Sequence, residues 1–372
     1  MAQGPFLRAD SAFRRHILVA VFFNRERMCG EQARPTSVRI WGAITSFMVG
    51  AILFIATAIS PVMASEKISV RLDWTPHGMH APFYLAVEKG WFRRSGLDVT
   101  IEDGNGSVVT VQLVGAGQFD VGHASLSSVA IARGKDIPVI SIAGFIRKSD
   151  MGVLVPAGSG WKTPKDLEGK KVAYTAGSLE GPFIDTFFGA SRNKVDFLTV
   201  DAATKVGIYL SGNADAVIST VPYVIPIVAA KRPSEGILFA SSGMNLPGFG
   251  LFTTREKLKE KGDAITRLTS IIADGWNYIF DGHVDEAVQA IIRNRSQVPL
   301  NAGVLKGQIE NYKTFFYTEA TKGKPIGIQS EQDWAETIKV MADAGLLKKG
   351  SRPTDYFTND FIRPNYLASL PK

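Results

Sequence analysis

The segment Asp73-Trp-Thr-Pro-His-Gly-Met-His80 gathers residue types that can hold a small molecule. A strand is predicted to end at Trp74, and Pro76 and Gly78 then break the chain before a helix that begins near Pro82. Tryptophan offers a flat apolar face to a planar ligand, and histidine offers one donor and one acceptor. Because open α/β sheets bind their ligands at the carboxyl ends of strands, we interpret this turn as part of a binding site.

Within this turn, Trp74, His77 and His80 are the candidate ligand contacts, and Tyr84 on the following helix is grouped with them. Trp74 taken alone is equally consistent with a core position, and His77 with a surface turn. His77 and His80 are three residues apart, which on a helix places both on one face. A metal site would need a third ligand, and no nearby acid shows ligand spacing. We therefore predict no metal centre.

Four further polar residues, Ser125, Ser178, Glu180 and Tyr223, also follow predicted strands. Ser178 and Glu180 precede a helix, so the hydroxyl and the free backbone N–H groups there can hold an acceptor or an anion. Each of these residues alone is more often an N-cap or a packing residue. Their shared placement at strand ends makes them candidates for the same ligand site.

The remainder of the chain alternates short strands with short helices, which indicates βαβ units and a mainly parallel sheet. The predicted strands are 68–74, 97–101, 120–123, 138–143, 171–175, 196–200, 215–219, 236–240 and 251–253. Helices are predicted to begin near 82, 107, 126, 181 and 204, and to span 263–280, 284–293, 305–312 and 331–344. This order predicts the α/β class.

A loop at 156–164 separates two series of strands and helices, and the C-terminal helices are expected to return to the first series. The predicted domains are a first lobe over 65–158, a second lobe over 159–246, and a return to the first lobe over 247–372. Two chain crossings, near 152–156 and 244–251, would act as hinges. Such an architecture has a central cleft, where small-molecule sites concentrate.

Residues 1–64 have the order of a secretory leader. Arg34 and Arg39 precede an uncharged apolar run, Ile40–Ser60, and Val62-Met63-Ala64 supplies the small residues of a cleavage site. We predict cleavage after Ala64 and a periplasmic location. The alternative is a retained anchor, because about 20 apolar residues can span a bilayer. Cys29 would leave with the leader, which excludes disulfides and thiolate chemistry from the mature chain.

The net charge of +7 belongs largely to the leader, which holds seven arginines and three acids, so the remainder carries +3. The basic residues of the remainder are scattered, whereas a nucleic-acid-binding protein concentrates them on one face. Nucleic acid is therefore not an expected partner. The sequence also lacks G-x-x-x-x-G-K-[ST], H-E-x-x-H and G-x-S-x-G motifs. We predict neither a cofactor nor an enzymatic activity.

Three blocks of the sequence, at 72–104, 115–143 and 163–175, resemble the thiamine-pyrimidine-synthase-like substrate-binding proteins. These belong to a wider superfamily that binds sulfonates, nitrate and taurine in the periplasm. The resemblance implies a type II periplasmic binding protein fold, with two α/β lobes and a hinged central cleft. It also implies a monomer that captures a small molecule and delivers it to an ABC permease of the inner membrane.

The resemblance leaves the ligand open among three classes. The aromatic and histidine residues favour a planar heterocycle, most of all a thiamine pyrimidine precursor, while sulfonate, nitrate or taurine and riboflavin are the alternatives. The same family contains a true pyrimidine synthase, and that enzyme is the remaining alternative. Its cofactor-binding lysine and sacrificial histidine align with Ala124 and Ser128 here, and its cysteine-rich iron motif aligns with Gly243–Phe249. These departures argue against the enzyme.

Overall fold

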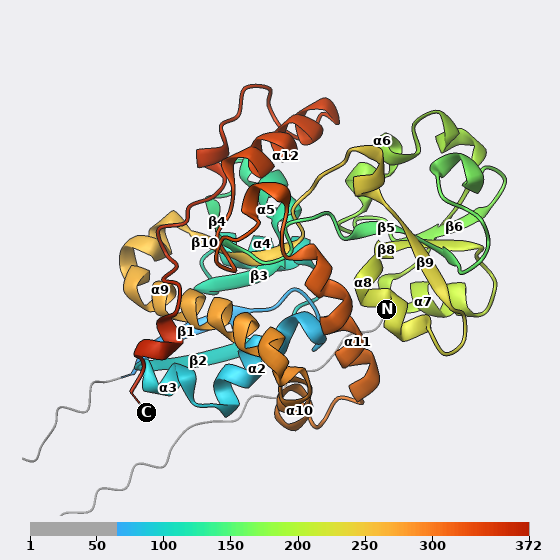
Figure 1. Cartoon of the computed structure of the whole chain (residues 1–372). Coiled ribbons are helices and arrows are strands. Elements are labelled where there is room, and N and C mark those ends of the chain that lie inside the picture. Colours follow the sequence, from blue (N-terminus) through green and yellow to red (C-terminus); the bar gives the residue numbers. More distant parts are fainter. Residues whose placement is uncertain (1–64, 372) are drawn as a thin grey trace, which may run out of the picture. The chain divides into compact units, whose positions relative to one another are not determined.

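The computed structural model describes residues 65–371, which form two five-stranded sheets (Figure 1). The first sheet has the order β2 (Leu97–Glu102), β1 (Glu66–Arg71), β3 (Val121–Ser125), β10 (Phe249–Thr254) and β4 (Val139–Gly144). The second has the order β7 (Asp196–Thr199), β6 (Lys171–Tyr174), β8 (Ala216–Thr220), β5 (Met151–Pro156) and β9 (Ser234–Leu238). The predicted leader, its cleavage site and the alternative membrane anchor lie outside the described residues.

Each sheet contains one antiparallel strand among parallel neighbours. Strand β5 runs antiparallel to β8 and β9, and β10 runs antiparallel to β3 and β4. These two strands are the first that the chain forms after each passage from one sheet to the other. The two mixed sheets with their helices confirm the predicted α/β class.

The pairing of β5 corrects one predicted domain boundary. A boundary at 158/159 leaves this strand in the first lobe, whereas the strand pairs within the second sheet. The chain passes between the sheets at residues 145–150 and 239–248, and not at the predicted 152–156 and 244–251. We call these two segments the first and second crossings. The division into two lobes remains our proposal, with the crossings as its boundaries.

The burial of the strands explains the distribution of apolar and polar residues in their sequences. Strands β3, β4 and β10 are buried along almost their whole length, because neighbours or helices cover both faces, and their sequences are accordingly runs of apolar and small residues. Strand β1, near one side of the first sheet, instead alternates buried and partly exposed residues from Ile68 onward, and β2 alternates exposed and partly exposed residues after the buried Leu97. The apolar residues at every second position of β1 therefore lie on its buried face.

Helices follow most strands, as predicted. Those associated with the first sheet are α2 (Ala81–Glu88), α3 (Trp91–Arg94), α4 (Ser107–Gly115), α5 (Leu126–Gly134), α9 (Arg255–Tyr278), α10 (Val284–Asn294), α11 (Ala302–Tyr312) and α12 (Glu331–Asp343). The second sheet carries α6 (Ile184–Phe188), α7 (Ala202–Leu210) and α8 (Val221–Val228). Helix α8 is not among the predicted helices, because its two prolines, Pro222 and Pro226, are residue types that usually indicate a loop. Pro222 lies in the first turn, where proline is tolerated.

Two adjacent residues of β10 point into different hydrophobic cores. Leu251 packs in a cluster with Leu268 and Trp276 of α9, whereas Phe252 packs in a cluster that also contains Val153 of β5. Successive residues of a strand face opposite sides of a sheet, so β10 separates these two cores. The second cluster extends across both sheets. Among the helices of residues 65–371, none has both the length and the apolar composition that a membrane span requires.

Strand β10 fits between its neighbours only because it contains Gly250. An added Cβ there would lie 2.2 Å from the carbonyl oxygen of Ala143 and 2.9 Å from a methyl carbon of Leu126. We therefore expect Gly250→Ala to lower the free energy of unfolding by about 1–3 kcal/mol in urea titrations. Gly207→Ala in α7 is the matched control, because a Cβ there meets nothing within 4 Å and alanine favours a helix. Equal destabilisation by both substitutions would contradict this account.

Candidate functional site

A cavity of about 530 Å³ lies between the two sheets, and we call it the cleft. It is lined by residues from the segments 73–77, 105–109, 175–180, 202–206 and 219–227, with Phe249 and Tyr312. These segments follow the carboxyl ends of β1, β2, β6, β7 and β8, and four of them include or lead into the first turns of α4, α6, α7 and α8. The cleft thus occupies the position where open α/β sheets bind ligands.

Five of the eight sequence-predicted site residues line this cleft. Trp74 and His77 come from the turn after β1, while Ser178, Glu180 and Tyr223 come from the second sheet. Segments of both sheets, distant from each other in the sequence, therefore place these side chains around one cavity. Their contact with a ligand remains a proposal.

The other three predicted site residues lie behind the cleft wall. His80 is fully buried and hydrogen-bonds to Asp73, Ser125 is buried at the end of β3, and Tyr84 is buried on α2. None of the three is among the residues that line the cleft. These three side chains do not face the cleft here, and their direct contact with ligand stays a prediction. A position at the end of a predicted strand indicates that a residue lies near the ligand-binding edge of the sheet. It does not indicate whether its side chain lines the cleft or is buried behind the wall.

The carboxylate of Asp73 is the centre of a buried polar cluster that the sequence reading left out of the site. Its Oδ1 lies 2.9 Å from His80 Nε2 and 2.7 Å from His123 Nδ1. Its Oδ2 lies 3.7 Å from His77 Nε2. All four side chains are buried, and Asp73 and His77 also line the cleft. One carboxylate in the turn after β1 thus connects two histidines of that turn to the middle of β3.

The backbone sets the tautomers of two of these rings. The N–H of Met79 donates to His77 Nδ1 at 3.3 Å, and the N–H of His77 donates to His80 Nδ1 at 3.4 Å. Since a neutral imidazole carries one proton, the Nε2 of each ring carries it. Both Nε2–H groups are therefore available to donate towards the Asp73 carboxylate.

The protonation of the cluster follows from burial and these hydrogen bonds. Burial by itself raises the pKa of Asp73, but the hydrogen bonds from His123, His77 and His80 outweigh it and hold that pKa well below its usual range. Burial, followed by the proximity of His77, lowers the pKa of His80 to about 3. The cleft wall therefore contains a carboxylate anion that receives hydrogen bonds from a neutral His80 ring.

Asp73, His80 and His123 also bring three possible metal-ligand atoms within 4.8 Å of one another. The sequence interpretation that no nearby acid could complete a histidine site was therefore wrong, because Asp73 lies close to His80 in space. Two direct N–H···O contacts already account for the arrangement, as a bound cation would have to replace them. The prediction that no metal is bound here stays a prediction.

Glu180 and Lys205 form a second charged group in the cleft. Their Oε1 and Nζ atoms are 3.5 Å apart, and both side chains are less than one-tenth exposed. This distance exceeds that of a strong charge-assisted hydrogen bond. Both residues line the cleft, so each retains hydrogen-bonding capacity for a third partner. The sequence reading missed Lys205, which lies inside α7 and carries no signal beyond helix periodicity.

The cleft combines an excess of negative charge with several backbone donors. Its charged lining consists of Asp73, Glu180 and Lys205, which gives a net charge of −1. The first turns of α4, α7 and α8 also border it, and such turns present free N–H groups. Trp74 and Tyr223 supply aromatic surface. The site therefore suits an uncharged or cationic planar molecule that carries both hydrogen-bond donors and acceptors.

Asp150, in the first crossing, is a buried acid behind the cleft. Among the described residues its Oδ2 has no hydrogen-bond partner. Burial raises the pKa of Asp150 to about 7, and the negative charge of Glu180 adds to the shift. An ionised Asp150 therefore costs folding free energy that a neutral side chain would not.

Comparison with known proteins identifies the relatives of this chain. A family model described as NMT1/THI5 like matches residues 77–286, more than half of the chain. The formylaminopyrimidine-binding protein of Halalkalibacterium halodurans is 26% identical over 301 residues, which cover 77% of this chain and 89% of that protein. The 4-amino-5-hydroxymethyl-2-methylpyrimidine phosphate synthase THI11 of Saccharomyces cerevisiae is 38% identical over 152 residues, or 40% of this chain and 44% of the enzyme.

Solved structures support the fold. The periplasmic aliphatic sulphonate-binding protein SsuA of Escherichia coli superposes with a TM-score of 0.61 at 13% identity, covering 81% of this chain and 93% of that one. At this identity the similarity concerns the fold alone. It confirms the predicted periplasmic-binding-protein architecture.

Asp150→Asn tests the buried acid. Because the folded state binds the Asp150 proton more tightly than the unfolded state, the native protein should lose stability relative to the variant as the pH rises from about 4 to about 7. Above that range we expect the variant to be more stable by about 2–4 kcal/mol, measured by urea unfolding across pH. Asp98→Asn, at an exposed position on β2, should instead follow the native curve. A constant difference between native protein and Asp150→Asn across pH would contradict the assignment.

Proposed function

The chain belongs to the NMT1/THI5-like family, and on that premise we propose that it is the solute-binding component of an ABC importer. In this proposal the protein works as a monomer in the periplasm, after removal of its leader. It captures a thiamine pyrimidine precursor in the cleft and delivers it chemically unaltered to a permease. The formylaminopyrimidine named for the H. halodurans relative supports this ligand class.

The charge pattern of the cleft is the observation that carries the proposal. An aminopyrimidine has an exocyclic amino group that donates hydrogen bonds and ring nitrogens that accept them. Asp73 and Glu180 lie on opposite walls and accept hydrogen bonds, while the helix starts and Lys205 donate them. Trp74 can stack on the ring. Each feature of the ligand thus has a complementary group in the lining.

The same pattern argues against the anionic ligands of the wider superfamily. A sulfonate or nitrate entering this cleft would approach two buried carboxylates and one lysine, and that lysine is already close to Glu180. Placing an anion beside buried like charges is unfavourable unless cations outnumber them. We therefore rank the pyrimidine above sulfonate, nitrate and taurine.

The cleft also lacks the groups expected of the related synthase. Ala124 is fully buried in β3 and Ser128 lies on α5, and neither lines the cleft. By the resemblance, these positions align with the lysine and the histidine of the synthase. Gly243–Phe249, which replaces the cysteine-rich motif, lies mostly in the second crossing. We propose binding without catalysis on these grounds.

Hinge closure is the proposed mechanism of capture. The ligand would contact Asp73 and Trp74 on one wall and Glu180 and Tyr223 on the other, so only a closed arrangement satisfies both sets. The two crossings, as the segments that connect the sheets, would absorb the rotation. The permease would then recognise the closed form.

Ligand selectivity tests the function directly. In calorimetric titrations of the purified protein, we expect 4-amino-5-hydroxymethyl-2-methylpyrimidine or its formylamino analogue to bind at least 100-fold more tightly than methanesulfonate or nitrate, a difference of about 2.7 kcal/mol. The ligand recovered after binding should be unchanged by mass. Tighter binding of either anion, or conversion of the pyrimidine, would overturn the proposal.

Trp74→Ala tests the proposed stacking contact. Loss of the aromatic face should weaken pyrimidine binding by about 1–3 kcal/mol, as measured for stacked bases. Trp161→Ala is the control, because Trp161 is a partly exposed tryptophan of the second lobe that does not line the cleft. The interpretation of Trp74 as a ligand contact fails if both variants bind like the native protein.

A further inference from the structure

The turn after β2 borders the cleft, and it carries an asparagine that the sequence reading left out of the site. Gly104, Asn105 and Gly106 form this turn, between the end of β2 and the start of α4. Asn105 is exposed and lines the cleft. Its amide is therefore accessible to a molecule in that space.

Backbone hydrogen bonds hold both neighbours of Asn105 against the turn after β1. The N–H of Gly104 donates to the carbonyl of Trp74 at 3.1 Å, and the N–H of Gly106 donates to the carbonyl of Asp73 at 2.7 Å. Asn105 lies between these two anchored residues. The turn after β2 is therefore fixed beside the residue proposed to stack on the ligand.

Gly104 permits this close approach because it has no side chain. A Cβ there would lie 2.1 Å from the carbonyl oxygen of Leu72 and 2.4 Å from the carbonyl carbon of Asp73. Both contacts are with backbone, so any other residue at this position would displace the turn. The hydroxyl of Thr110 in α4 adds a hydrogen bond to the carbonyl of Leu72 at 2.7 Å. Asn105 consequently has a well-defined backbone position at the edge of the cleft.

The Asn105 amide holds a donor and an acceptor side by side in one plane. Among the cleft-lining residues of the described chain, Asn105 alone carries a side-chain amide. The carboxylates of Asp73 and Glu180 only accept hydrogen bonds, and the ammonium of Lys205 only donates them. The two nitrogens of His77 point in different directions, and its Nδ1 already accepts a backbone N–H. The amide is therefore suited to a ligand edge that presents an acceptor next to a donor.

We propose that Asn105 recognises the 4-amino group of the ligand together with the adjacent ring nitrogen. This inference rests on the pyrimidine ligand proposed above. The amide oxygen would accept a hydrogen bond from the amino group, and the amide N–H would donate one to the ring nitrogen, as asparagine does with adenine in DNA. The second hydrogen of the amino group stays available to a carboxylate of the cleft.

This contact makes Asn105 a specificity-determining residue. A pyrimidine without the amino group keeps only the hydrogen bond to its ring nitrogen. A sulfonate or nitrate offers acceptors alone, so it gains nothing from the amide oxygen. Asn105 thereby adds a preference that depends on the pattern of donors and acceptors to the preference that the cleft charges provide.

The test combines two ligands with substitutions at Asn105. Calorimetric titrations compare 4-amino-5-hydroxymethyl-2-methylpyrimidine with 5-hydroxymethyl-2-methylpyrimidine, which lacks the amino group. Asn105→Ala should weaken binding of the amino ligand by about 10-fold but that of the amino-free ligand by about 3-fold or less, because only one hydrogen bond is then lost. Asn105→Asp keeps an acceptor, loses the donor and adds a third carboxylate, so it should weaken binding of the amino ligand by about 3-fold or more.

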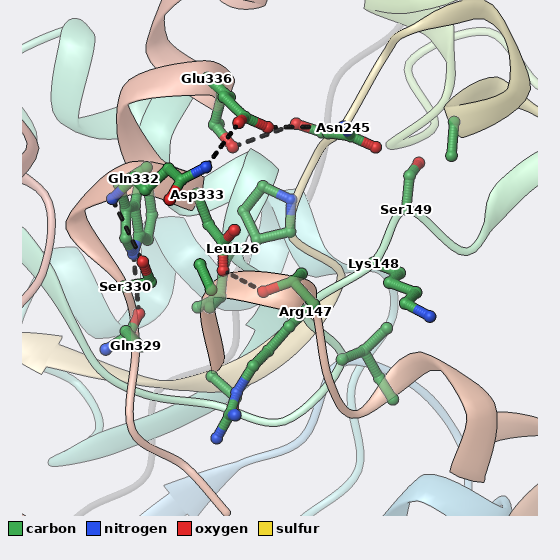
Figure 2. Close-up of a pocket in the computed structure, with 18 of the residues that line it drawn as sticks. Leu126, Arg147, Lys148, Ser149, Asn245, Gln329, Ser330, Gln332, Asp333 and Glu336 are labelled. Atoms are coloured by element: carbon green, nitrogen blue, oxygen red, sulfur yellow. Dashed lines mark hydrogen bonds between the residues drawn. The ribbon is translucent and has the colours of Figure 1, made fainter. Parts of the chain in front are cut away.

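Gln332→Ala is the matched control, because Gln332 is an exposed amide away from the cleft. Figure 2 shows it on α12 in a separate cavity of about 350 Å³ beside the crossings, which shares no lining residue with the cleft. This variant should bind both pyrimidines like the native protein. Asn105→Ala should match the native protein in urea unfolding, since an exposed side chain contributes little to stability.

Three outcomes would overturn the assignment of Asn105. Native affinity of Asn105→Ala for the amino ligand would remove the contact but leave the proposed function intact. Equal losses for the two ligands would show that Asn105 does not recognise the amino group. Failure of the native protein to bind the amino ligand would overturn the proposed function and this inference together.

Discussion

The site depends on a buried carboxylate at the end of the first strand. Asp73 would be costly to ionise at its position if it had no donors, yet the imidazoles of His80 and His123 lie within 3 Å of its Oδ1. Because the backbone fixes the tautomers of His77 and His80, the direction of the hydrogen bonds is set by the turn itself. The carboxylate therefore holds together the turn after β1 and the middle of β3, and it places a negative charge in the cleft wall.

This charge determines which molecules the cleft can accept. With Glu180 on the facing wall, two carboxylates outnumber the single ammonium of Lys205. The fold is shared with a sulphonate-binding protein at 13% identity, so the fold does not select the ligand. The selection comes from a few charged side chains at the strand ends.

Much of the fold could be predicted from the sequence, because the pattern of apolar residues within a single strand or helix indicates its type. Strand β1 alternates buried and partly exposed residues, β2 alternates exposed and partly exposed ones after Leu97, and α9 is long and amphipathic, so periodicity reveals them. Helix α8 was missed because Pro222 and Pro226 resemble loop residues. Strand β5 is not among the predicted strands, and its pairing with β8 and β9 is a long-range choice that no local pattern specifies.

The site could be predicted only in part, for a related reason. Strand-end position correctly brought Trp74, His77, Ser178, Glu180 and Tyr223 to one cavity. It could not distinguish them from His80 and Ser125, which are buried and do not line the cavity. Asp73 could have been found by asking which group would satisfy two buried histidines. Lys205 could not, because its role depends on α7 packing its side chain beside Glu180.

A crystal structure with a bound aminopyrimidine tests the central claim most directly. The account predicts the intact ring on Trp74, with its N–H groups directed to Asp73 on one wall and Glu180 on the other, and no metal ion at the Asp73 carboxylate. A ligand bound away from both carboxylates, or a cation coordinated by Asp73, His80 and His123, would contradict it.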